Sequence, residues 1–526
     1  MGNQQRAAAL RFVPASGTVA SLPERSSAFS ARDWALLAAI AVAAVLIALI
    51  DPVGYIGGRW DDGRYLEAAL RWNASGPNLG VNHWALRWPI VLPAAAAIHA
   101  FGLTNTALML PGLATFAALL ALTFAGVRIV TGDRLSAMLA SLSVATTLAP
   151  TAAATRLTAD LPEALFWAMA LWSLVAATRS NGGTQARWLL ATGLGCGLAW
   201  AVRETALGLG IVLLAAGIAC HALRSWRFGW IIVGALLVVV PEQLVLWRAS
   251  GDFFYRLVTD LHHIDIPSTH LAGGVATGTF APLNPELASR WDGAGPVRLF
   301  WAIDPWLNLF INSQYGLNFL AAALLAPLAW PTLKPHERQA LRWIAVVIAA
   351  NIVTVVYIVA TDPQPRMFMP AIVAAATALG PLLVITWHRR PRWPVAALAT
   401  AKLLVFTAAL MLASRYAAMP SLTGRVLAGT SGPVAADRLT LSHLALAPTE
   451  LKARLHLQPL AGACLLLTIE KADAMPDMPP GQWQMLRQAA LASPIIDAAR
   501  RLIPTLSSNV PQVTLWRLQA SGCASP

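Results

Sequence analysis

The run WALLAAIAVAAVLIALI, residues 34–50, has no charged side chain and decides the class of fold. A helix of about 20 apolar residues is long enough to cross the hydrocarbon core of a bilayer. Residues 1–33 before it are polar and carry arginines, and no convincing small-residue cleavage site follows it. We therefore predict an uncleaved first membrane span and not a removed signal peptide.

The composition agrees with a membrane protein. Of the 526 residues, 57% are hydrophobic and only 12% are charged, with a mean hydropathy of +0.59. Soluble domains carry about 25% charged residues, so a water-soluble fold is excluded. The apolar runs are too long for a membrane β-barrel, whose strands alternate over about 10 residues. The net charge of +13 is scattered over short loops, which disfavours a nucleic-acid partner.

Further apolar runs follow the first and are separated by short segments rich in Arg, Pro and Gly. They predict an all-α polytopic membrane protein with about eleven transmembrane helices. The predicted spans are residues 34–50, 105–128, 135–149, 161–177, 188–202, 205–222, 228–247, 316–331, 343–360, 367–386 and 394–413.

Residues 188–222 form either one long helix, with Arg203 and Glu204 in its middle, or a hairpin with this pair at the turn. The distribution of positive charge favours the hairpin, because short cytoplasmic loops are enriched in Lys and Arg. With a hairpin, the single short outer loop downstream holds only Arg366, whereas the inner loops hold Arg224, Arg227, Lys334, Arg338, Arg342, Arg389, Arg390 and Arg392. The N-terminus is then cytoplasmic.

This topology predicts a cytoplasmic segment 1–33, a membrane module 34–413 with outer loops 51–104 and 248–315, and an extracytoplasmic domain 414–526. The last domain is expected to be a small α/β unit. Its expected elements are a strand at 463–469, a helix near 482–501 and a strand at 513–518. Cys464 and Cys523 flank the two strands and either pair or stay reduced, whereas Cys196 and Cys220 are expected to be small buried side chains.

The motif Asp61-Asp62-Gly63-Arg64-Tyr65 follows the first span by about ten residues. Two adjacent carboxylates just outside a bilayer are either a general base, a cation site or the start of a solvated loop. His83, Arg87 and Pro89 come next, and then an apolar stretch at 90–101 that is too short to span. We expect this stretch either to lie in the membrane interface, where the tryptophans around it are also favoured, or to re-enter the membrane.

The D-D-x-x-Y arrangement, followed by this loop, resembles the first outer loop of the GT-C glycosyltransferases. It is most similar to the family 39 type, the protein O-mannosyltransferases and the aminoarabinose transferases of lipid A. In that family the first acid of D-[DE]-x-x-Y activates the acceptor, and the resemblance gives this role to Asp61. The family's Lys before Pro-Pro is replaced here by Arg87-Trp88-Pro89, which keeps the positive charge.

Two further matches fall on the outer side of the predicted topology. Asp160, in Arg156-Leu157-Thr158-Ala159-Asp160-Leu161-Pro162, is similar to the family's second acidic residue. The alternative is a helix N-cap. Arg366, in Pro365-Arg366-Met367-Phe368-Met369-Pro370, resembles the Arg of R-Y-x-x-P, with Met367 in place of the aromatic. It is expected either to hold a phosphate oxygen or to be a snorkelling interface side chain.

Other candidates rest on weaker signals. Arg203 and Glu204 are either a structural pair or part of the site. Tyr315 either contacts a lipid phosphate or is an interfacial aromatic. Tyr65 and His83 are expected to shape the acceptor loop together with Glu204. The ligand-like residues His262, His263, Asp265 and His270 match no defined metal motif, so a metal there is a weak expectation.

The resemblance implies a transferase that takes a sugar from a polyprenyl-phosphate donor and passes it, with inversion, to a hydroxyl of a lipid, glycan or protein acceptor. Asp61 would act as the base, Arg366 with Arg87 or Arg203 would bind the donor phosphate, and Asp62 and Asp160 would orient the acceptor or share a divalent cation with Asp61. This proposal requires Asp61 and Arg366 to meet in one site. The alternatives are a transporter or lipid flippase, and a non-catalytic assembly or sensor protein.

Overall fold

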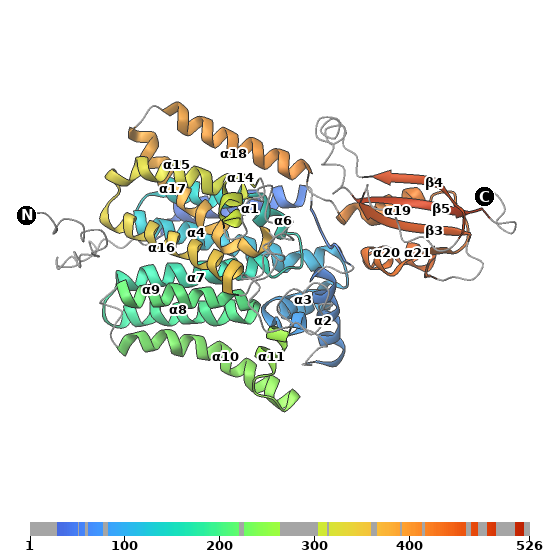
Figure 1. Cartoon of the computed structure of the whole chain (residues 1–526), viewed down its shortest axis with the longest axis horizontal. Coiled ribbons are helices and arrows are strands. Elements are labelled where there is room, and N and C mark those ends of the chain that lie inside the picture. The colour runs from blue at the N-terminus through green and yellow to red at the C-terminus, as the bar shows by residue number, and fades with distance from the viewer. Residues whose placement is uncertain are drawn as a thin grey trace, which may run out of the picture.

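A computed structural model describes most of the chain. The described residues are 29–50, 52–57, 61–76, 83–219, 226–262, 303–312, 315–358, 365–389, 392–412, 416–458, 464–471, 481–490 and 511–519. Within them the chain forms a large helical bundle followed by a small sheet domain, and these two parts lie end to end (Figure 1).

The long helices of the bundle agree with the predicted apolar runs. They are α1 (Ala31–Ile50), α4 (Asn105–Thr131), α5 (Arg134–Ala145), α7 (Asp160–Thr178), α8 (Gly182–Val202), α9 (Leu207–Ala219), α10 (Gly229–Ser250), α15 (Asn318–Ala329), α16 (Pro335–Val353), α17 (Met369–Arg389) and α18 (Arg392–Leu412). Seven helices in the described part of the chain are long and apolar enough to cross a membrane, so the protein is a multi-pass membrane protein. α5, α9 and α15 are shorter, and the count of eleven spans stays a prediction.

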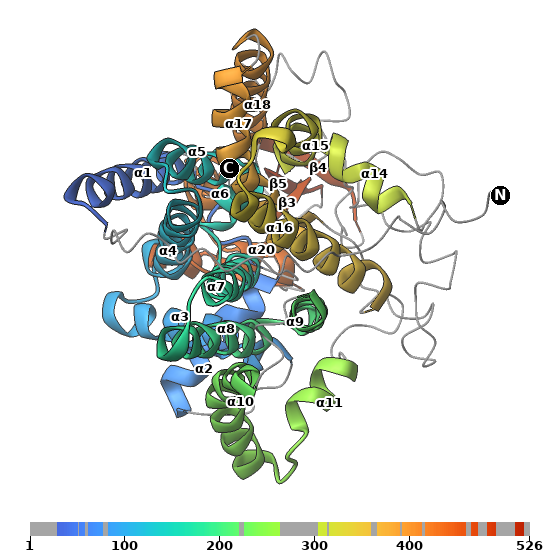
Figure 2. The same cartoon turned by 90° about the vertical axis from the view of Figure 1, so that its left-hand side faces the viewer.

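The bundle has two central helices and a periphery. In the spanning windows of α7 and α17, 78% and 83% of the residues are buried, against 28% in α1 and 17% in α18. Figure 2, which looks along the helices, shows α1, α10 and α18 at the outside. α8 approaches α10 closely, because Gly193 and Gly234 leave room where a Cβ atom would overlap backbone of the opposite helix.

The break at residues 203–204 is present in the structure. α8 ends at Val202, Arg203 has extended backbone angles, and Glu204–Ala206 form a 3-10 turn before α9 begins. One continuous helix over 188–222 is therefore wrong. The break places an arginine and a glutamate at one end of the bundle.

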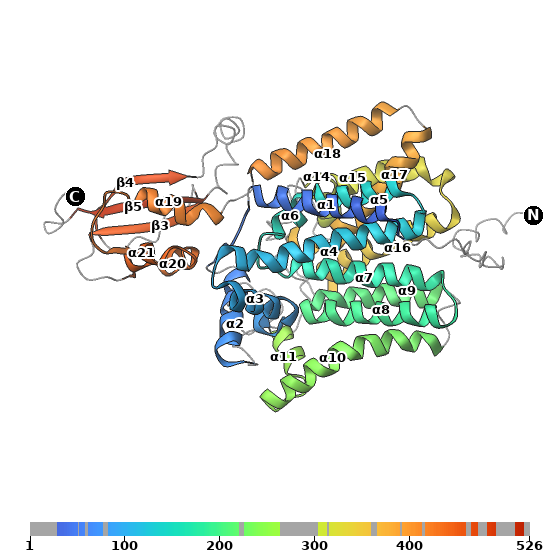
Figure 3. The ribbon, with the colours of Figure 1, turned by 180° about the vertical axis from the view of Figure 1, so that it is seen from behind.

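The segment after α1 folds into two short helices at the end of the bundle that faces the sheet domain, here called the sheet end (Figure 3). α2 (Asp61–Ser75) begins with the two aspartates, and α3 (Trp88–Phe101) contains the apolar stretch expected in the interface. α6 (Leu148–Ala153), α11 (Tyr255–His262) and α14 (Asp304–Ile311) are further short helices.

The C-terminal part is a mixed five-stranded sheet with the order β2-β1-β3-β5-β4. β1 pairs in parallel with β2 and with β3, whereas β5 pairs antiparallel with β3 and β4. The strands are β1 (Val434–Ala436), β2 (Leu455–Leu457), β3 (Leu465–Lys471), β4 (Trp483–Ala490) and β5 (Pro511–Leu518), and the helices are α19 (Met419–Val426), α20 (Arg438–His443) and α21 (Thr449–Ala453).

The two predicted strands correspond to β3 and β5, but the predicted helix near 482–501 is wrong where the chain is described. Residues 483–490 form β4, which pairs with β5 in the register Gln484↔Arg517 and Ala490↔Gln512. Residues 491–501 lie outside the described part. Cys464 is disulfide-bonded; Cys523, the partner considered from the sequence, and Cys220 also lie outside it. Cys196 is a free thiol.

Candidate active site

Asp61 and Arg366 meet at the sheet end of the bundle. Arg366 Nη1 lies 2.8 Å from Asp61 Oδ2, a contact between residues 305 positions apart in the sequence. Trp84 Nε1 donates to the other oxygen, Oδ1, at 3.1 Å. The side chains of Asp61 and Arg366 are 14% and 23% exposed, so this pair is accessible from outside the protein.

Local structure explains the position of each partner. Asp61 and Asp62 occupy the first turn of α2, where unpaired backbone N–H groups favour negative charge. Arg366 lies in the 3-10 turn Pro365–Phe368 before α17. The fully buried Asn351 on α16 supports this turn, because its Nδ2 donates to Met367 O at 3.4 Å and its Oδ1 accepts from Ala371 N at 3.4 Å.

Asp62 points to a different arginine. Arg156 Nη2 lies 2.6 Å from Asp62 Oδ1, and the Asp62 side chain is fully buried. Arg156 comes from the loop between α6 and α7, in the same stretch as Asp160, but it was not among the residues singled out from the sequence. The two adjacent aspartates thus face two arginines from different parts of the chain.

Arg203 is the buried centre of the site. Its Nη2 lies 3.0 Å from Asp160 Oδ1 and its Nη1 lies 3.1 Å from Glu163 Oε2, and no more than 2% of any of these three side chains is exposed. Thr158 Oγ1 donates to Asp160 Oδ2 at 2.6 Å, and Thr205 Oγ1 donates to Glu163. Ala159 is the N-cap of α7 and Asp160 is the first residue of the helix, so the N-cap alternative is wrong. Glu163 was not singled out from the sequence.

Arg87 connects the first loop to the break after α8. Its Nη1 donates to Tyr65 Oη at 2.8 Å, and its Nη2 donates to Glu204 Oε2 at 3.3 Å. Glu204 therefore binds Arg87, while its neighbour Arg203 binds carboxylates of α7. His83 is buried and contacts Trp84, whose indole binds Asp61; the two rings are tilted, with centroids 3.7 Å apart.

Tyr315 packs among aromatic and apolar side chains. Tyr315 is buried in an apolar cluster and makes edge contacts with Phe319 and Phe368, the second of which follows Arg366 by two residues. His262 ends α11. The other weak metal candidates, His263, Asp265 and His270, lie outside the described residues.

The two adjacent carboxyl groups differ in acidity. Burial acts to raise the pKa of Asp61, but the positive charges of Arg366, Arg87 and the other nearby arginines outweigh it, and the pKa lies below the ordinary value. Burial raises the pKa of Asp62; Arg156 opposes this effect without cancelling it, and the negative charge of Asp61 adds to it. Asp61 is thus held ionised, whereas Asp62 is the more basic group of the pair.

In the described part of the chain, no group of three or more His, Cys, Asp or Glu side chains is placed to hold a metal ion. Asp61, Asp62 and Asp160 instead contact three different arginines. The hypothesis that they share a divalent cation gains no support from this arrangement and stays a prediction.

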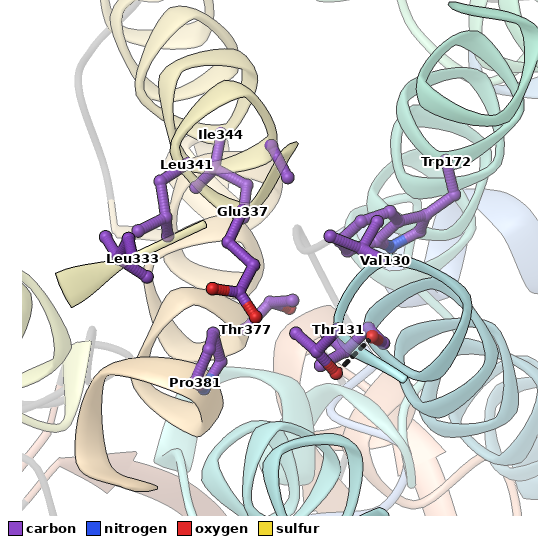
Figure 4. Close-up of a pocket in the computed structure, with 11 residues that line it drawn as sticks. Val130, Thr131, Trp172, Leu333, Glu337, Leu341, Ile344, Thr377 and Pro381 are labelled. Carbon is purple, nitrogen blue, oxygen red and sulfur yellow. Dashed lines mark hydrogen bonds between the residues drawn. The ribbon is translucent and has the colours of Figure 1, made fainter. Parts of the chain in front are cut away.

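Of two small pockets in the described part of the chain, one lies beside the site and the other is remote from it. One, of about 30 Å³, lies between α3, α4 and α7 and is lined by Pro89, Arg156 and Thr158 among other residues. The second, of about 10 Å³, is lined by Val130, Trp172, Glu337 and apolar neighbours (Figure 4). Trp172 follows Asp160 by 12 positions on α7, which is about 18 Å along a helix. The second pocket is therefore remote from the ion pairs and has room for one water molecule at most.

Comparison with known proteins gives one family match and, among others, two matches to solved structures. The family model described as dolichyl-phosphate-mannose-protein mannosyltransferase matches residues 80–247. The crystal structure of ArnT from Cupriavidus metallidurans bound to undecaprenyl phosphate superposes with a TM-score of 0.56 at 16% identity, covering 94% of this chain and 100% of that chain. The oligosaccharyltransferase of Archaeoglobus fulgidus gives a TM-score of 0.49 at 12% identity, covering 80% of this chain and 62% of that chain. No curated protein matches.

The fold is therefore that of a GT-C membrane protein. The chain resembles the type represented by the protein O-mannosyltransferases and ArnT, as its motifs indicate. The family model covers residues that include Arg87, Asp160 and Arg203, whereas Asp61 and Arg366 lie outside the matched range.

Proposed function

We propose that this protein is a membrane glycosyltransferase that takes a sugar from a polyprenyl-phosphate donor and transfers it, with inversion, to an acceptor hydroxyl at the outer face of the membrane. The observation that supports it most is the 2.8 Å contact between Asp61 and Arg366 in a GT-C fold. The contact is the geometry that the motifs require, and it joins the most exposed arginine of the site to the most exposed carboxylate of the site.

The proposed setting is the inner membrane of a bacterium, with segment 1–33 in the cytoplasm and domain 414–526 in the periplasm. The distribution of positive charge over the loops supports this orientation. It places the sheet end, with Asp61 and Arg366, outside the cytoplasm. Nucleotide sugars are not available there, so a donor already carried across the membrane on a lipid suits the site.

The lipid phosphate is the part of the donor that the site is best suited to bind. The similar ArnT was crystallised with undecaprenyl phosphate, and arginine is the side chain that best matches the geometry of phosphate oxygens. Arg366 is the most exposed of the four arginines Arg87, Arg156, Arg203 and Arg366. We assign it to the phosphate, with Arg87 and Arg203 contributing positive charge behind it.

The reaction that we propose is a direct displacement. The acceptor oxygen forms a bond to the anomeric carbon as the bond from that carbon to the phosphate oxygen breaks, and the polyprenyl phosphate leaves with the bonding electrons. Asp61 takes the hydroxyl proton of the acceptor, and Arg366 stabilises the negative charge that grows on the phosphate. Asp62 and Asp160 orient the acceptor, while Tyr65, His83 and Glu204 hold the loop that carries Arg87.

In the absence of donor, Asp61 is a weak base because Arg366 is bonded to it. We propose that the donor phosphate draws Arg366 away from this carboxylate. The pKa of Asp61 then rises, because Arg366 is the largest of the positive charges that lower it and burial continues to act against ionisation. Donor binding would thus prepare the base.

This scheme predicts a pH effect. The pKa of Asp61 is lowered in the folded protein, so the Asp61–Arg366 pair and the stability that it contributes are fully present above the ordinary pKa of an aspartate. Both are lost as the pH falls through the lowered value. The acid limb of kcat/KM, which reports the free enzyme, should therefore lie at lower pH than the acid limb of kcat, which reports the donor complex. Initial rates measured across pH would check this. Coincident limbs would contradict the scheme.

Arg366→Lys tests the phosphate contact. Lysine keeps the charge but cannot make a forked contact to phosphate. Loss of one charge-assisted hydrogen bond costs about 1.5–3 kcal/mol, which corresponds to a decrease in kcat/KM of roughly 10- to 100-fold. Arg71→Lys, on the exposed face of α2 in an ion pair with Glu67, is the control and should leave transfer unchanged. Equal activity of the Arg366 variant and the wild type would remove Arg366 from the site.

Transfer of radiolabel from a polyprenyl-phosphate sugar to an acceptor, by the purified protein in detergent, tests the function itself. A transporter or flippase would move the donor across a bilayer without breaking the sugar–phosphate bond. A sensor or assembly protein would do neither. Labelled acceptor is the expected product. If the donor stays intact with lipid, glycan and protein acceptors alike, the proposal is refuted.

A further inference from the structure

The five residues Val53–Gly57, which connect α1 to the start of α2, are all buried although they form no helix or strand. They lie at the sheet end, immediately before the aspartates of the site. A connecting segment is normally exposed, because buried backbone needs partners for its polar groups. Two partners of this segment come from the C-terminal domain, and a third comes from the loop between α6 and α7.

Two hydrogen bonds join the segment to that domain. Ala417 N donates to Val53 O at 2.9 Å, and the Nδ1 atom of His443, at the end of α20, bonds with Ile56 O. His443 also stacks on Tyr416, with ring centroids 5.4 Å apart. Burial lowers the pKa of His443, so the ring is neutral and Nδ1–H is available as the donor to the Ile56 carbonyl.

Two glycines allow this close approach. Gly54 and Gly57 have φ of +70° and +73°, a region that other residues rarely adopt. A Cβ atom on Gly54 would lie 2.7 Å from the Cβ of Ala417, and one on Gly57 would overlap with the carbonyl oxygen of Ser442. Both positions therefore require glycine for the backbone conformation and for the contact.

The opposite side of the segment contacts the charged site. Gly54 N donates to Thr155 Oγ1 at 3.5 Å, and Thr155 precedes the arginine that binds Asp62. Burial raises the pKa values of both Tyr55 and Tyr416, and the negative charge of Asp62 adds to this rise in each case. Asp62 is therefore within electrostatic reach of the segment and of the C-terminal domain.

We propose that the C-terminal domain positions Asp61 and Asp62 by clamping residues 53–57, so that it is a component of the transferase and not an appended partner-binding module. His443 is the positioning residue, because it binds the carbonyl of Ile56. Gly54 and Gly57 allow the close contact of the segment with the C-terminal domain. This inference rests on the proposed function, because the clamp acts on the carboxylates assigned to the acceptor. The ion pairs of Arg203 join it to Asp160 and Glu163 of α7, so they involve neither residues 53–57 nor α2.

Gly57→Ala is the first test, with Gly76→Ala as the matched control. Gly76 has the same left-handed backbone, with φ +72°, and ends the same helix that carries the aspartates, but a Cβ there meets no atom within 4 Å. A displacement of a reacting group by about 1 Å costs roughly 100-fold in rate. We expect a decrease in kcat of about this size for Gly57→Ala, little change in the KM for donor, and near wild-type kinetics for Gly76→Ala.

His443→Ala and His443→Asn form a second test that avoids the strained backbone. Asparagine places an amide donor near the position of Nδ1, so it should restore most of the kcat that alanine removes. A merely structural role would predict loss of folded protein in proportion to activity. The clamp predicts folded, monodisperse His443→Ala protein with low kcat and an unchanged KM for donor.

Loss of the contact between the C-terminal domain and residues 53–57 can be measured without an activity assay. Val53 is 8% exposed, and a Val53→Cys thiol should react slowly with maleimide, as followed by peptide mass spectrometry. Adding Gly57→Ala should speed the labelling by about tenfold or more, whereas adding Gly76→Ala should not, because only opening of the clamp exposes this site.

The outcomes separate the two proposals. Wild-type protein without transfer activity refutes the proposed function, and this inference with it. Active wild type with unimpaired Gly57→Ala and His443→Ala variants refutes the clamp alone, whatever the labelling rate. Faster labelling together with a fallen kcat supports it.

Discussion

Asp61→Asn is expected to lower the rate of sugar transfer by roughly 10²- to 10⁴-fold, the usual contribution of a general base. Asparagine has nearly the same size and can still accept from Trp84 Nε1, which lies 3.1 Å from Asp61 Oδ1. It removes the carboxylate that would take the acceptor proton. The measurement is radiolabel transfer at saturating donor and acceptor, where kcat reports the chemical step.

Glu67→Gln is the control for this variant. Glu67 lies on the same helix as Asp61 and forms ion pairs with Arg64 and Arg71, but its side chain is 47% exposed and lies outside the charged site. Neutralising it should leave transfer unchanged. The assignment of the base fails if a folded Asp61→Asn protein transfers sugar at a rate similar to that of the Glu67 variant.

Apolar run length predicted the bundle well, because a bilayer leaves a chain few alternatives to helices. Each predicted span overlaps a helix in the described part of the chain, and the break at Arg203 follows from charge distribution. The predicted helix near 482–501 failed for a different reason. Gln484, Met485, Leu486 and Arg487 have good helix propensity, yet residues 483–490 pair with β5 in the sheet. Pairing with a distant strand overrode local preference, and propensity cannot reveal such pairing.

Site residues could be predicted from the sequence where they belong to a recognisable motif and the predicted topology places that motif on the outer side. Asp61 and Arg366 were both placed on the outer side, and the structure brings them together. Arg156 and Glu163 were missed, because their partners Asp62 and Arg203 lie 94 and 40 positions away and no local pattern joins them. A signal for Glu163 existed, since an ionisable side chain inside a predicted span is a functional candidate by default.

The largest effect on stability is expected from Arg203→Met. Arg203, Asp160 and Glu163 are almost completely buried, and methionine fills a similar volume without a charge. Removing the arginine leaves two carboxylates buried without their cation, and breaking a buried ion pair in this way costs about 3–5 kcal/mol. A large decrease in the thermal transition of the detergent-solubilised protein is the expected result. Arg187→Met, on the exposed face of the same helix α8, should change it little.

A triple variant separates stability from catalysis. Arg203→Met combined with Asp160→Asn and Glu163→Gln removes all three charges, and replacing a whole buried network by neutral groups is often neutral for stability. The thermal transition should therefore return toward the wild-type value. Transfer should stay low, because Arg203 would no longer contribute positive charge behind the donor phosphate and Asp160 would no longer orient the acceptor. Recovery of both properties would show that the Arg203 network only supports the fold, and would leave Asp61, Arg87 and Arg366 to account for the chemistry.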